Sequence, residues 1–228
     1  QLRIEIDIHH QARSTCMMRE QKGIFIPVHD KSSLWSKGYE IREYNKIKPK
    51  GYRAIDIGAH VGIWTRRLAN DFDEVIAFEP MPKHIECHKK NCEGLLNVKL
   101  NQIGLSDVSG QKVMTTKDNN SGMSTLMSPL WKSPKTTVPI ETRTLDSYNF
   151  PKIDFIKIDV EGWEEQVLLG GMETILKYRP RMYIEIWTKP RDKMRPANYD
   201  KISDMLYKEM GYTLQRIGND NYLCESAL

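Results

Sequence analysis

The chain has 228 residues, 39% of them hydrophobic and 28% charged, which is typical of a soluble globular protein with one sizeable core. Its net charge of +4 comes without a dense basic run, so nucleic acid is an unlikely partner. Three absences argue against a membrane-spanning, secreted or disulfide-stapled protein. No apolar stretch approaches about 20 residues, residues 1–10 do not resemble a signal peptide, and no Cys-x-x-Cys pair occurs. We therefore expect a cytoplasmic location.

Residues 1–50 carry few signals beyond a short strand at 23–28 and a helix at 39–47. We expect them to form a lead-in or cap segment before a single globular domain at 51–228. Within that domain apolar runs alternate with amphipathic segments. The expected strands are 53–57, 74–78, 97–105, 111–116, 136–144, 153–160, 181–187, 212–217 and 222–225. The expected helices follow residue 61 and cover 84–92, 163–178 and 199–210.

This order predicts an α/β fold with a doubly wound, mostly parallel sheet and an antiparallel edge. The polar stretch at 117–134 is expected to be a loop, and its residues 119–125 are long enough to act as a lid over a site, with Gly122 as the hinge. Its Trp131, together with Trp187, could stack on the face of a sugar, although core packing is equally expected for Trp187.

A glycine-rich turn follows the first expected core strand, in the stretch Ala54-Ile55-Asp56-Ile57-Gly58-Ala59-His60-Val61-Gly62. Glycines let the backbone approach a ligand, and the helix that follows offers free N–H groups. The spacing is Asp-x-Gly-x-x-x-Gly, which lacks the third glycine of a dinucleotide fingerprint. It also lacks the lysine of a P-loop. The pattern therefore favours a nucleotide-like ligand without phosphate.

Two acids narrow the choice of ligand further. Glu79 ends the second core strand, where a carboxylate can accept hydrogen bonds from the two hydroxyls of a ribose. Asp56 ends the first, where it could pair with a cationic amino group. A ligand with a ribose, no phosphate and a cationic amino-acid tail corresponds to S-adenosylmethionine.

Several motifs together resemble the FkbM family of S-adenosylmethionine-dependent methyltransferases. They are the glycine turn, Ala77-Phe78-Glu79-Pro80, Gly104-Leu105-Ser106-Asp107, Thr144-Leu145-Asp146-Ser147 and Asp154-Phe155-Ile156-Lys157-Ile158-Asp159-Val160-Glu161-Gly162. Arg179-Pro180 before a strand ending at Glu185 also fits, and the block from Lys157 to Gly162 is the most family-specific part. The similarity runs from about residue 50 to 187.

The resemblance implies a class I methyltransferase fold with seven strands, the last antiparallel, and O-methylation of a sugar, glycan or secondary-metabolite hydroxyl. By position it assigns Asp56, Gly58, Ala59, His60 and Gly62 to the methionine end of the cofactor and Glu79 to the ribose. It assigns Gly104, Leu105 and Ser106 to the adenine. Two positions depart from the family pattern, since Asn is more usual than His60 and Ala more usual than Gly104.

The chemistry is expected at Asp159, where the fourth parallel strand ends, with Glu161 next and Glu185 third. Methyl transfer needs an oriented acceptor oxygen, and a carboxylate can take its proton. Asp159 could instead cap a helix or hold the amino group of the cofactor. The three acids could also bind a divalent cation, but no metal is predicted.

Other patterns carry less weight. His84, Cys87, His88 and Cys92 share one helical face with metal-ligand residue types, yet an ordinary helix is the more expected explanation. The basic segment 189–196 could contact an anionic glycan or nucleic acid, but is better read as a solvated loop. Two alternative functions remain, an RNA or cap methyltransferase and a non-catalytic methyltransferase-like binding module. The low net charge disfavours the first, and the intact acids disfavour the second.

Overall fold

The computed structural model describes residues 17–31, 39–117, 120–127, 135–191, 193 and 195–227. Its strands form a two-stranded, a seven-stranded and a four-stranded sheet. The strands are β1 (Met18–Gln21), β2 (Ile24–Pro27), β3 (Gly51–Ile57), β4 (Phe72–Phe78), β5 (Val98–Asn101), β6 (Gly104–Leu105), β7 (Gly110–Lys117), β8 (Asn120–Thr125), β9 (Lys135–Arg143), β10 (Phe155–Ile158), β11 (Arg181–Glu185), β12 (Tyr212–Arg216) and β13 (Asn221–Ser226).

The helices lie between these strands, as alternation of apolar and amphipathic segments predicts. They are α2 (Tyr39–Ile47), α3 (Ile63–Asp71), α4 (Pro82–Asn91), a 3-10 turn η1 (Asp146–Tyr148), α5 (Glu164–Leu169), α6 (Met172–Tyr178), α7 (Tyr199–Asp204) and a π-helical turn η2 (Met205–Glu209). Within the described residues, no helix is long and apolar enough to span a membrane.

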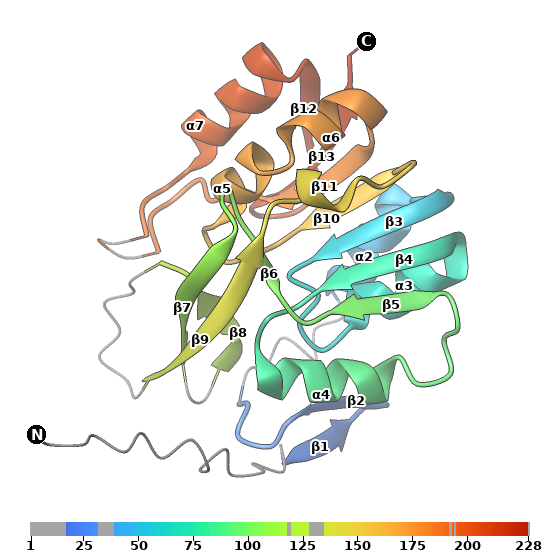
Figure 1. The fold of residues 1–228 in the computed structure, drawn as a ribbon, viewed down its shortest axis with the longest axis vertical. Coiled ribbons are helices and arrows are strands. Elements are labelled where there is room, and N and C mark those ends of the chain that lie inside the picture. The colour runs from blue at the N-terminus through green and yellow to red at the C-terminus, as the bar shows by residue number, and fades with distance from the viewer. Residues whose placement is uncertain are drawn as a thin grey trace, which may run out of the picture.

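The large sheet has the strand order β12-β13-β11-β10-β3-β4-β5 (Figure 1). Neighbouring strands from β11 to β5 pair in parallel. Strand β13 pairs antiparallel with both β11 and β12. The expectation of an α/β fold built on a mostly parallel sheet is confirmed. The carboxyl ends of the parallel strands meet at one edge, which is where such folds bind ligands.

Side chains alternate between two cores, one on each face of this sheet. On one face Ile55, Ile76 and Ile156 pack with residues of α5, α6, α7 and η2. On the other face the neighbouring residues Ala54 and Val75 pack with residues of α2 and α3. Because successive residues of a strand point to opposite faces, the apolar runs of β3, β4 and β10 supply both cores at once.

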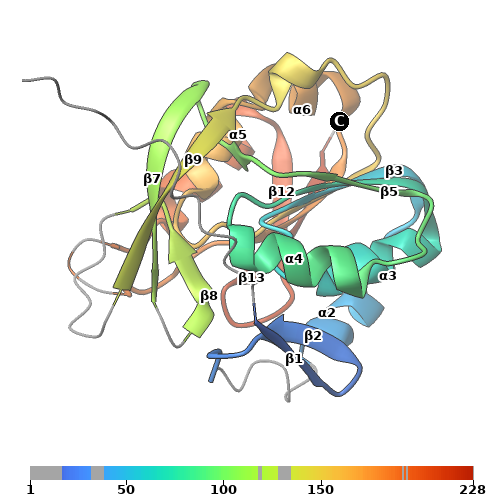
Figure 2. The ribbon, with the colours of Figure 1, turned by 60° about the horizontal axis from the view of Figure 1, so that its bottom comes forward.

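The four-stranded sheet, with the order β6-β9-β7-β8, stands beside the large sheet in both views (Figures 1 and 2). Two expectations are corrected here. The single strand expected at 97–105 is two strands, because β5 pairs with β4 whereas β6 leaves that sheet to pair with β9. Part of the loop expected at 117–134 is strand β8, which pairs with β7.

The β1–β2 hairpin lies against α4 in both views (Figures 1 and 2). The side chain of Asn91, at the end of α4, fixes it. Its Oδ1 accepts a hydrogen bond from the backbone N–H of Phe25 at 2.7 Å, and its Nδ2 donates to the carbonyls of Phe25 at 2.8 Å and Val61 at 2.7 Å. One buried amide thus ties the hairpin to the loop before α3.

The helix expected at 163–178 is interrupted at Gly170 and Gly171, which separate α5 from α6. The reason is packing. A Cβ at Gly170 would lie 1.9 Å from the carbonyl oxygen of Ser106, which follows β6. The helical segment can therefore pass this part of the chain only at a residue without a side chain. The helix expected at 199–210 likewise changes from α7 to the wider turn η2.

Candidate active site

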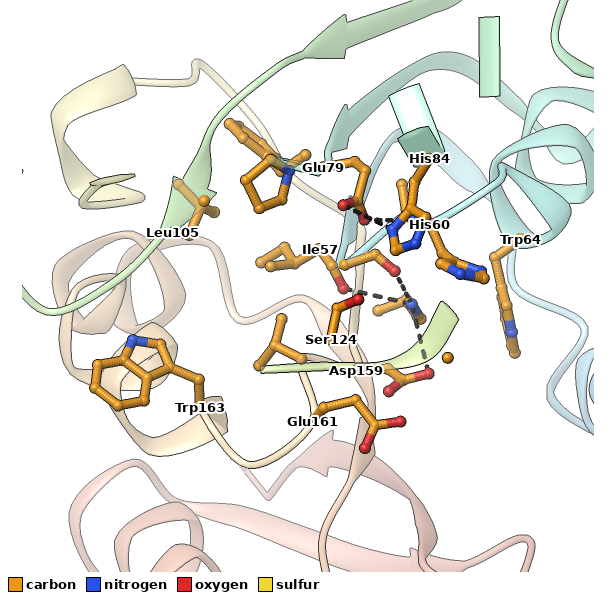
Figure 3. A pocket seen from close by; sticks show the side chains of 18 of the residues that line it. Ile57, His60, Trp64, Glu79, His84, Leu105, Ser124, Asp159, Glu161 and Trp163 are labelled. Carbon is orange, nitrogen blue, oxygen red and sulfur yellow. Dashed lines mark hydrogen bonds and ion pairs between the residues drawn. The ribbon is translucent and has the colours of Figure 1, made fainter. Parts of the chain in front are cut away.

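An open pocket lies at the carboxyl ends of β3, β4, β10 and β11, and its empty space, which includes open solvent, is about 1060 Å³. Figure 3 shows Leu105 and Trp163 on one side of the pocket and His60, His84 and Trp64 on the other. Strand β8 contributes Gly122 and Ser124 to its wall, and the acids that line it are Glu79, Asp159, Glu161 and Glu185.

The turn after β3 depends on Gly58, which adopts a left-handed φ of +74°. A Cβ at this position would lie 1.9 Å from the carbonyl oxygen of Asp159. The glycine therefore lets the end of β3 pass against the end of β10 and brings the turn next to Asp159. Both Gly58 and Ala59 line the pocket, as expected, whereas Gly62 does not. A Cβ at Gly62 would instead meet His88 and Cys92 of the α4 region at 2.9 and 3.0 Å.

The N–H groups of this turn are used inside the protein. Those of Gly58 and Ala59 both donate to the carbonyl of Phe78 at 3.0 Å, and that of Gly62 donates to Ala59 at 2.8 Å. The N–H of His60 donates to Glu79 Oε2 at 2.8 Å. These four N–H groups are therefore not free to bind a ligand.

Glu79 lies just after β4 and is held by three donors. Its Oε2 accepts from the His60 N–H, and its Oε1 accepts from the Met81 N–H at 2.9 Å and faces His84 Nδ1 at 3.2 Å. An ionised carboxylate has about four acceptor positions, so one remains, on Oε2. Burial raises the pKa of Glu79, and the two backbone hydrogen bonds oppose that rise. Glu79 is thus a fixed group with room for one further hydrogen bond rather than the two expected.

His60 and His84 form the wall beside Glu79, with their rings edge to face at 4.1 Å. Burial lowers the pKa of His60 well below its usual range and that of His84 to about 3. Both imidazoles are therefore neutral at physiological pH. The family departure at His60 thus places no positive charge at the wall of the pocket.

Asp56 lies beneath the pocket and does not line it. Its side chain is fully buried on the α3 face of β3, where Oδ2 accepts a hydrogen bond from Thr65 Oγ1 at 2.6 Å. Its Oδ1 lies 3.5 Å from the ammonium of Lys157, its register partner on β10. The expectation that Asp56 binds the amino group of a ligand does not agree with this position.

Lys157 reaches four oxygen atoms around the turn. Its Nζ donates to the carbonyls of Gly58 at 2.7 Å and Ile57 at 3.4 Å. It also pairs with Asp56 and lies 3.7 Å from Asp159 Oδ2. Among the described residues lining the pocket, Lys157 is the only lysine or arginine.

The side of the pocket toward the small sheet contains Gly104, Leu105 and Trp163. Ser106 was expected there too, but it is fully buried and does not line the pocket. Its Oγ accepts a hydrogen bond from Trp163 Nε1 at 3.0 Å and donates to Asp107 Oδ1 at 2.7 Å. Ser106 therefore orients the indole that does line the pocket.

The carboxylates of Asp159, Glu161 and Glu185 gather as expected, with one oxygen of each within 4.8 Å of the others. Asp159 and Glu161 face the same part of the pocket (Figure 3). Trp187 Nε1 donates to Glu185 Oε2 at 3.1 Å, and the guanidinium of Arg191 lies 3.4 Å from Oε1.

The turn that presents Glu161 is unusual, because Glu161 itself has a left-handed φ of +54°. Glu164 stabilises this turn by accepting hydrogen bonds from the N–H groups of Val160 and Gly162, both at 3.1 Å. From β8, Thr125 Oγ1 donates to the Glu161 carbonyl at 2.7 Å. The position of Glu161 is thus set by contacts from helix α5 and from strand β8.

Burial, followed by the negative charges of Asp159 and Glu164, raises the pKa of Glu161 to about 8. Burial and then the same cluster raise the pKa of Glu185 well above its usual range. At neutral pH the cluster therefore retains protons, because the close carboxylates do not all ionise together.

Glu161→Gln is expected to remove a pH dependence of stability. The folded protein holds the Glu161 proton up to about pH 8, whereas the unfolded chain releases it near the ordinary pKa of 4.5. The folded state binds more protons in that window, so wild-type stability falls as pH rises through it. The variant should therefore be more stable than wild type at pH 9, by an amount on the order of a few kcal/mol, with little difference between the two proteins at pH 4.

Urea unfolding at the two pH values measures this effect. Glu86→Gln, on an exposed carboxylate of α4 that pairs with Lys89, is the matched control and should show no such divergence. An equal stability difference between Glu161→Gln and wild type at both pH values would contradict the proton-holding role of Glu161.

Other sequence expectations resolve as follows. His84 faces Glu79, whereas His88 Nε2 lies 2.9 Å from Thr65 Oγ1, so the two histidines of the possible zinc set serve different partners. Trp187 is fully buried and does not line the pocket. Trp131 lies outside the described residues.

The segment 189–196 is expected to be a solvated loop, but its described residues Arg191 and Arg195 contact the acidic cluster and Trp187. The guanidinium of Arg191 pairs with Glu185 and with Asp220 at 3.1 Å, and Arg195 is buried against the ring of Trp187. Asp192 and Met194 lie outside the described residues.

Sequence reasoning gave no site role to several residues that line the pocket. Lys157 lies in the strand expected at 153–160 and lines the pocket. The sequence feature that could have marked it is a charged residue inside an apolar run. His84 was considered only as a zinc ligand. Trp163 could have been found from its place beside the Glu161-Gly162 turn, whereas nothing in the sequence of β8 marked Ser124.

Comparisons with known proteins agree with this architecture. The model of the methyltransferase FkbM domain matches residues 56–214. A curated relative, methyltransferase sdnD from Sordaria araneosa, is 24% identical over 198 residues, which cover 71% of this chain and 74% of that protein.

Two solved structures share the fold. Methyltransferase FkbM from Methylobacillus flagellatus superposes with a TM-score of 0.52 at 16% identity, over 77% of this chain and 43% of that one. The chain thus spans less than half of the Methylobacillus protein. A putative O-methyltransferase from Klebsiella pneumoniae gives a TM-score of 0.50 at 14% identity, over 89% and 84% of the two chains.

Proposed function

The chain belongs to the FkbM family of methyltransferases, and on this premise we propose that it transfers the methyl group of S-adenosylmethionine to a hydroxyl group of a sugar, a glycan or a secondary metabolite. The observation that carries the proposal is Glu79, a buried carboxylate held by three donors just after β4 with one acceptor position left. A preorganised acceptor at this edge of a parallel sheet is suited to a ribose hydroxyl.

The pocket also fits the charge of that cofactor. Four acids line it against one lysine, and because burial raises the pKa values of Glu161 and Glu185, we assign the attraction of a sulfonium and an amino group to Glu79 and Asp159. On the side of Trp163, Leu105 and Phe78 offer the apolar surface that an adenine ring needs. We assign the ribose to Glu79, the adenine to the Leu105–Trp163 side, and the methionine end to Ala59 and His60.

When bound, S-adenosylmethionine supplies an electrophilic methyl group. The chain supplies the orientation of the acceptor and a place for its proton. We assign the proton to Asp159, whose side chain is 41% exposed at the pocket and whose neighbour is Lys157. Glu161, with its pKa raised to about 8, would donate a hydrogen bond to the acceptor at neutral pH. Glu185 completes the acidic wall.

Asp159→Asn is expected to lower kcat about 100-fold while leaving the Kd for S-adenosylmethionine within about fivefold of wild type. Asparagine keeps the shape of the side chain but cannot take a proton. Steady-state rates and calorimetric titration of both proteins measure the two quantities. A large loss of affinity with unchanged turnover would instead place Asp159 in the cofactor site only.

The activity itself is tested by incubating the protein with S-adenosylmethionine and a panel of sugars, glycans and hydroxylated small molecules, followed by mass spectrometry. Release of S-adenosylhomocysteine with a new O-methyl group on one class of acceptor is the expected result. Methylation confined to nitrogen atoms or to RNA would contradict the proposed acceptor class.

We also propose that residues 51–228 are the cofactor-binding domain and that residues 1–50 cover part of it. In support, the described β1–β2 hairpin contacts α4 through Asn91, and α4 carries His84 of the pocket wall. A covering segment of this kind would bound the pocket on the side of the two histidines.

A further inference from the structure

Lys157 lies between two parts of the pocket, the turn at Gly58 and the acidic wall that begins at Asp159. Its ammonium holds the Gly58 carbonyl of the turn that lines the cofactor side, at 2.7 Å. The same ammonium lies 3.7 Å from Asp159, at the start of the acidic wall. A single cation therefore lies between the side of the pocket assigned to the methyl donor and the side assigned to the acceptor.

Burial makes the charge of this lysine consequential. The side chain of Lys157 is only 4% exposed, and that of its partner Asp56 is fully buried. Charges that are poorly screened by water act strongly over several ångströms. The ammonium extends its influence to Glu79, where burial raises the pKa and the Lys157 charge opposes the rise.

The charge balance of the site depends on both partners. Asp56 offsets Lys157 from below, where Thr65 also holds the carboxylate. Lys157 in turn offsets part of the negative charge of Asp159 and the other acids that line the pocket. The charge of Lys157 therefore repels a ligand that has a positive charge beside Asp159, whereas it does not repel a neutral ligand of the same shape.

We propose that Lys157 is a positioning residue whose buried charge sets how strongly the pocket prefers a cationic sulfonium donor over the neutral thioether product. The proposal rests on the proposed function, because it takes S-adenosylmethionine and S-adenosylhomocysteine as the two ligands. These molecules differ by one methyl group and one positive charge. The charge of Lys157 opposes that of the acids and so limits the affinity of the pocket for the cationic donor. Its hydrogen bond to the Gly58 carbonyl holds the turn in the binding geometry.

The test is calorimetric titration of both ligands into a set of variants at one pH and ionic strength. Lys157→Met is expected to raise the affinity ratio of S-adenosylmethionine to S-adenosylhomocysteine at least about fivefold. Asp56→Asn, which leaves the lysine uncompensated, should lower that ratio. Asp56→Asn combined with Lys157→Met should return it toward wild type, and Lys157→Arg, which keeps the charge, should leave it within about twofold.

A purely structural role for Lys157 would weaken both ligands by the same factor, and an unchanged ratio in Lys157→Met would overturn the proposal. If Lys157→Met fails to fold because it leaves Asp56 unpaired, the comparison of Asp56→Asn with the double variant carries the same test. The affinity ratio of S-adenosylmethionine to S-adenosylhomocysteine must be higher in the double variant than in Asp56→Asn. Failure of the wild type to bind either ligand would refute the proposed function instead, which is a distinguishable outcome.

Discussion

Glu79→Ala is expected to bind S-adenosylmethionine about 100-fold more weakly than wild type. The substitution removes the acceptor assigned to the ribose, and a hydrogen bond to a charged group contributes about 1.5–3 kcal/mol. It also leaves the N–H groups of His60 and Met81 without the carboxylate that they share, which loosens the turn. Calorimetric titration of variant and wild type measures the loss.

Two further variants separate these effects. Glu86→Ala removes an exposed carboxylate from helix α4, where it pairs with Lys89, and should leave binding unchanged. Glu79→Gln keeps the volume and one acceptor oxygen, so it should bind with intermediate affinity. Wild-type affinity in a folded Glu79→Ala protein would remove Glu79 from the cofactor site.

Gly58→Ala is expected to destabilise the protein by about 3–5 kcal/mol and to abolish ligand binding with it. The new Cβ would lie 1.9 Å from the Asp159 carbonyl oxygen, so the end of β3 must move away from β10. The left-handed φ of +74° adds about 1–2 kcal/mol for any residue with a Cβ. Urea unfolding monitored by circular dichroism measures the change.

Gly94→Ala is the matched control for the backbone term. Gly94 has a similar φ of +84°, but a Cβ there would have nothing within 4 Å. This variant should lose only about 1–2 kcal/mol and bind normally. Equal losses in the two variants would show that the close approach of β3 to β10 is not what requires glycine at position 58.

The central sheet was predictable because its signals are local. Strands β3, β4, β10 and β11 are apolar runs that end at acids or glycines, and each lies within about three residues of its expected bounds. The meeting of Glu79, Asp159, Glu161 and Glu185 follows from the same rule, since parallel strands bring their carboxyl ends together.

The small sheet was less predictable because its pairing is not local. Residues 97–105 are expected to form one strand. Only the pairing of Gly104 and Leu105 with β9 shows that the chain leaves the large sheet there and joins the small one. Apart from Met123, strand β8 consists of small and polar residues, and it has no apolar alternation. Its strand structure comes from pairing with β7, which sequence periodicity does not report.

Within the site, sequence position identified the strand ends but not the direction of each side chain. Asp56 and Lys157 lie one residue before the ends of their strands, on the face toward α3. The pair is therefore buried, although Asp56 belongs to the glycine motif. Ser106 was expected to contact the ligand but holds Trp163, because its Oγ faces the indole N–H.

Titration of the wild-type protein with S-adenosylmethionine by isothermal calorimetry tests the central claim most directly. The account predicts one site per chain with a micromolar Kd, in the pocket that Glu79, Asp159 and Lys157 line. Absence of binding by a folded protein, shown by a cooperative unfolding transition, would contradict the methyl-donor site and leave a methyltransferase-like binding module as the better description.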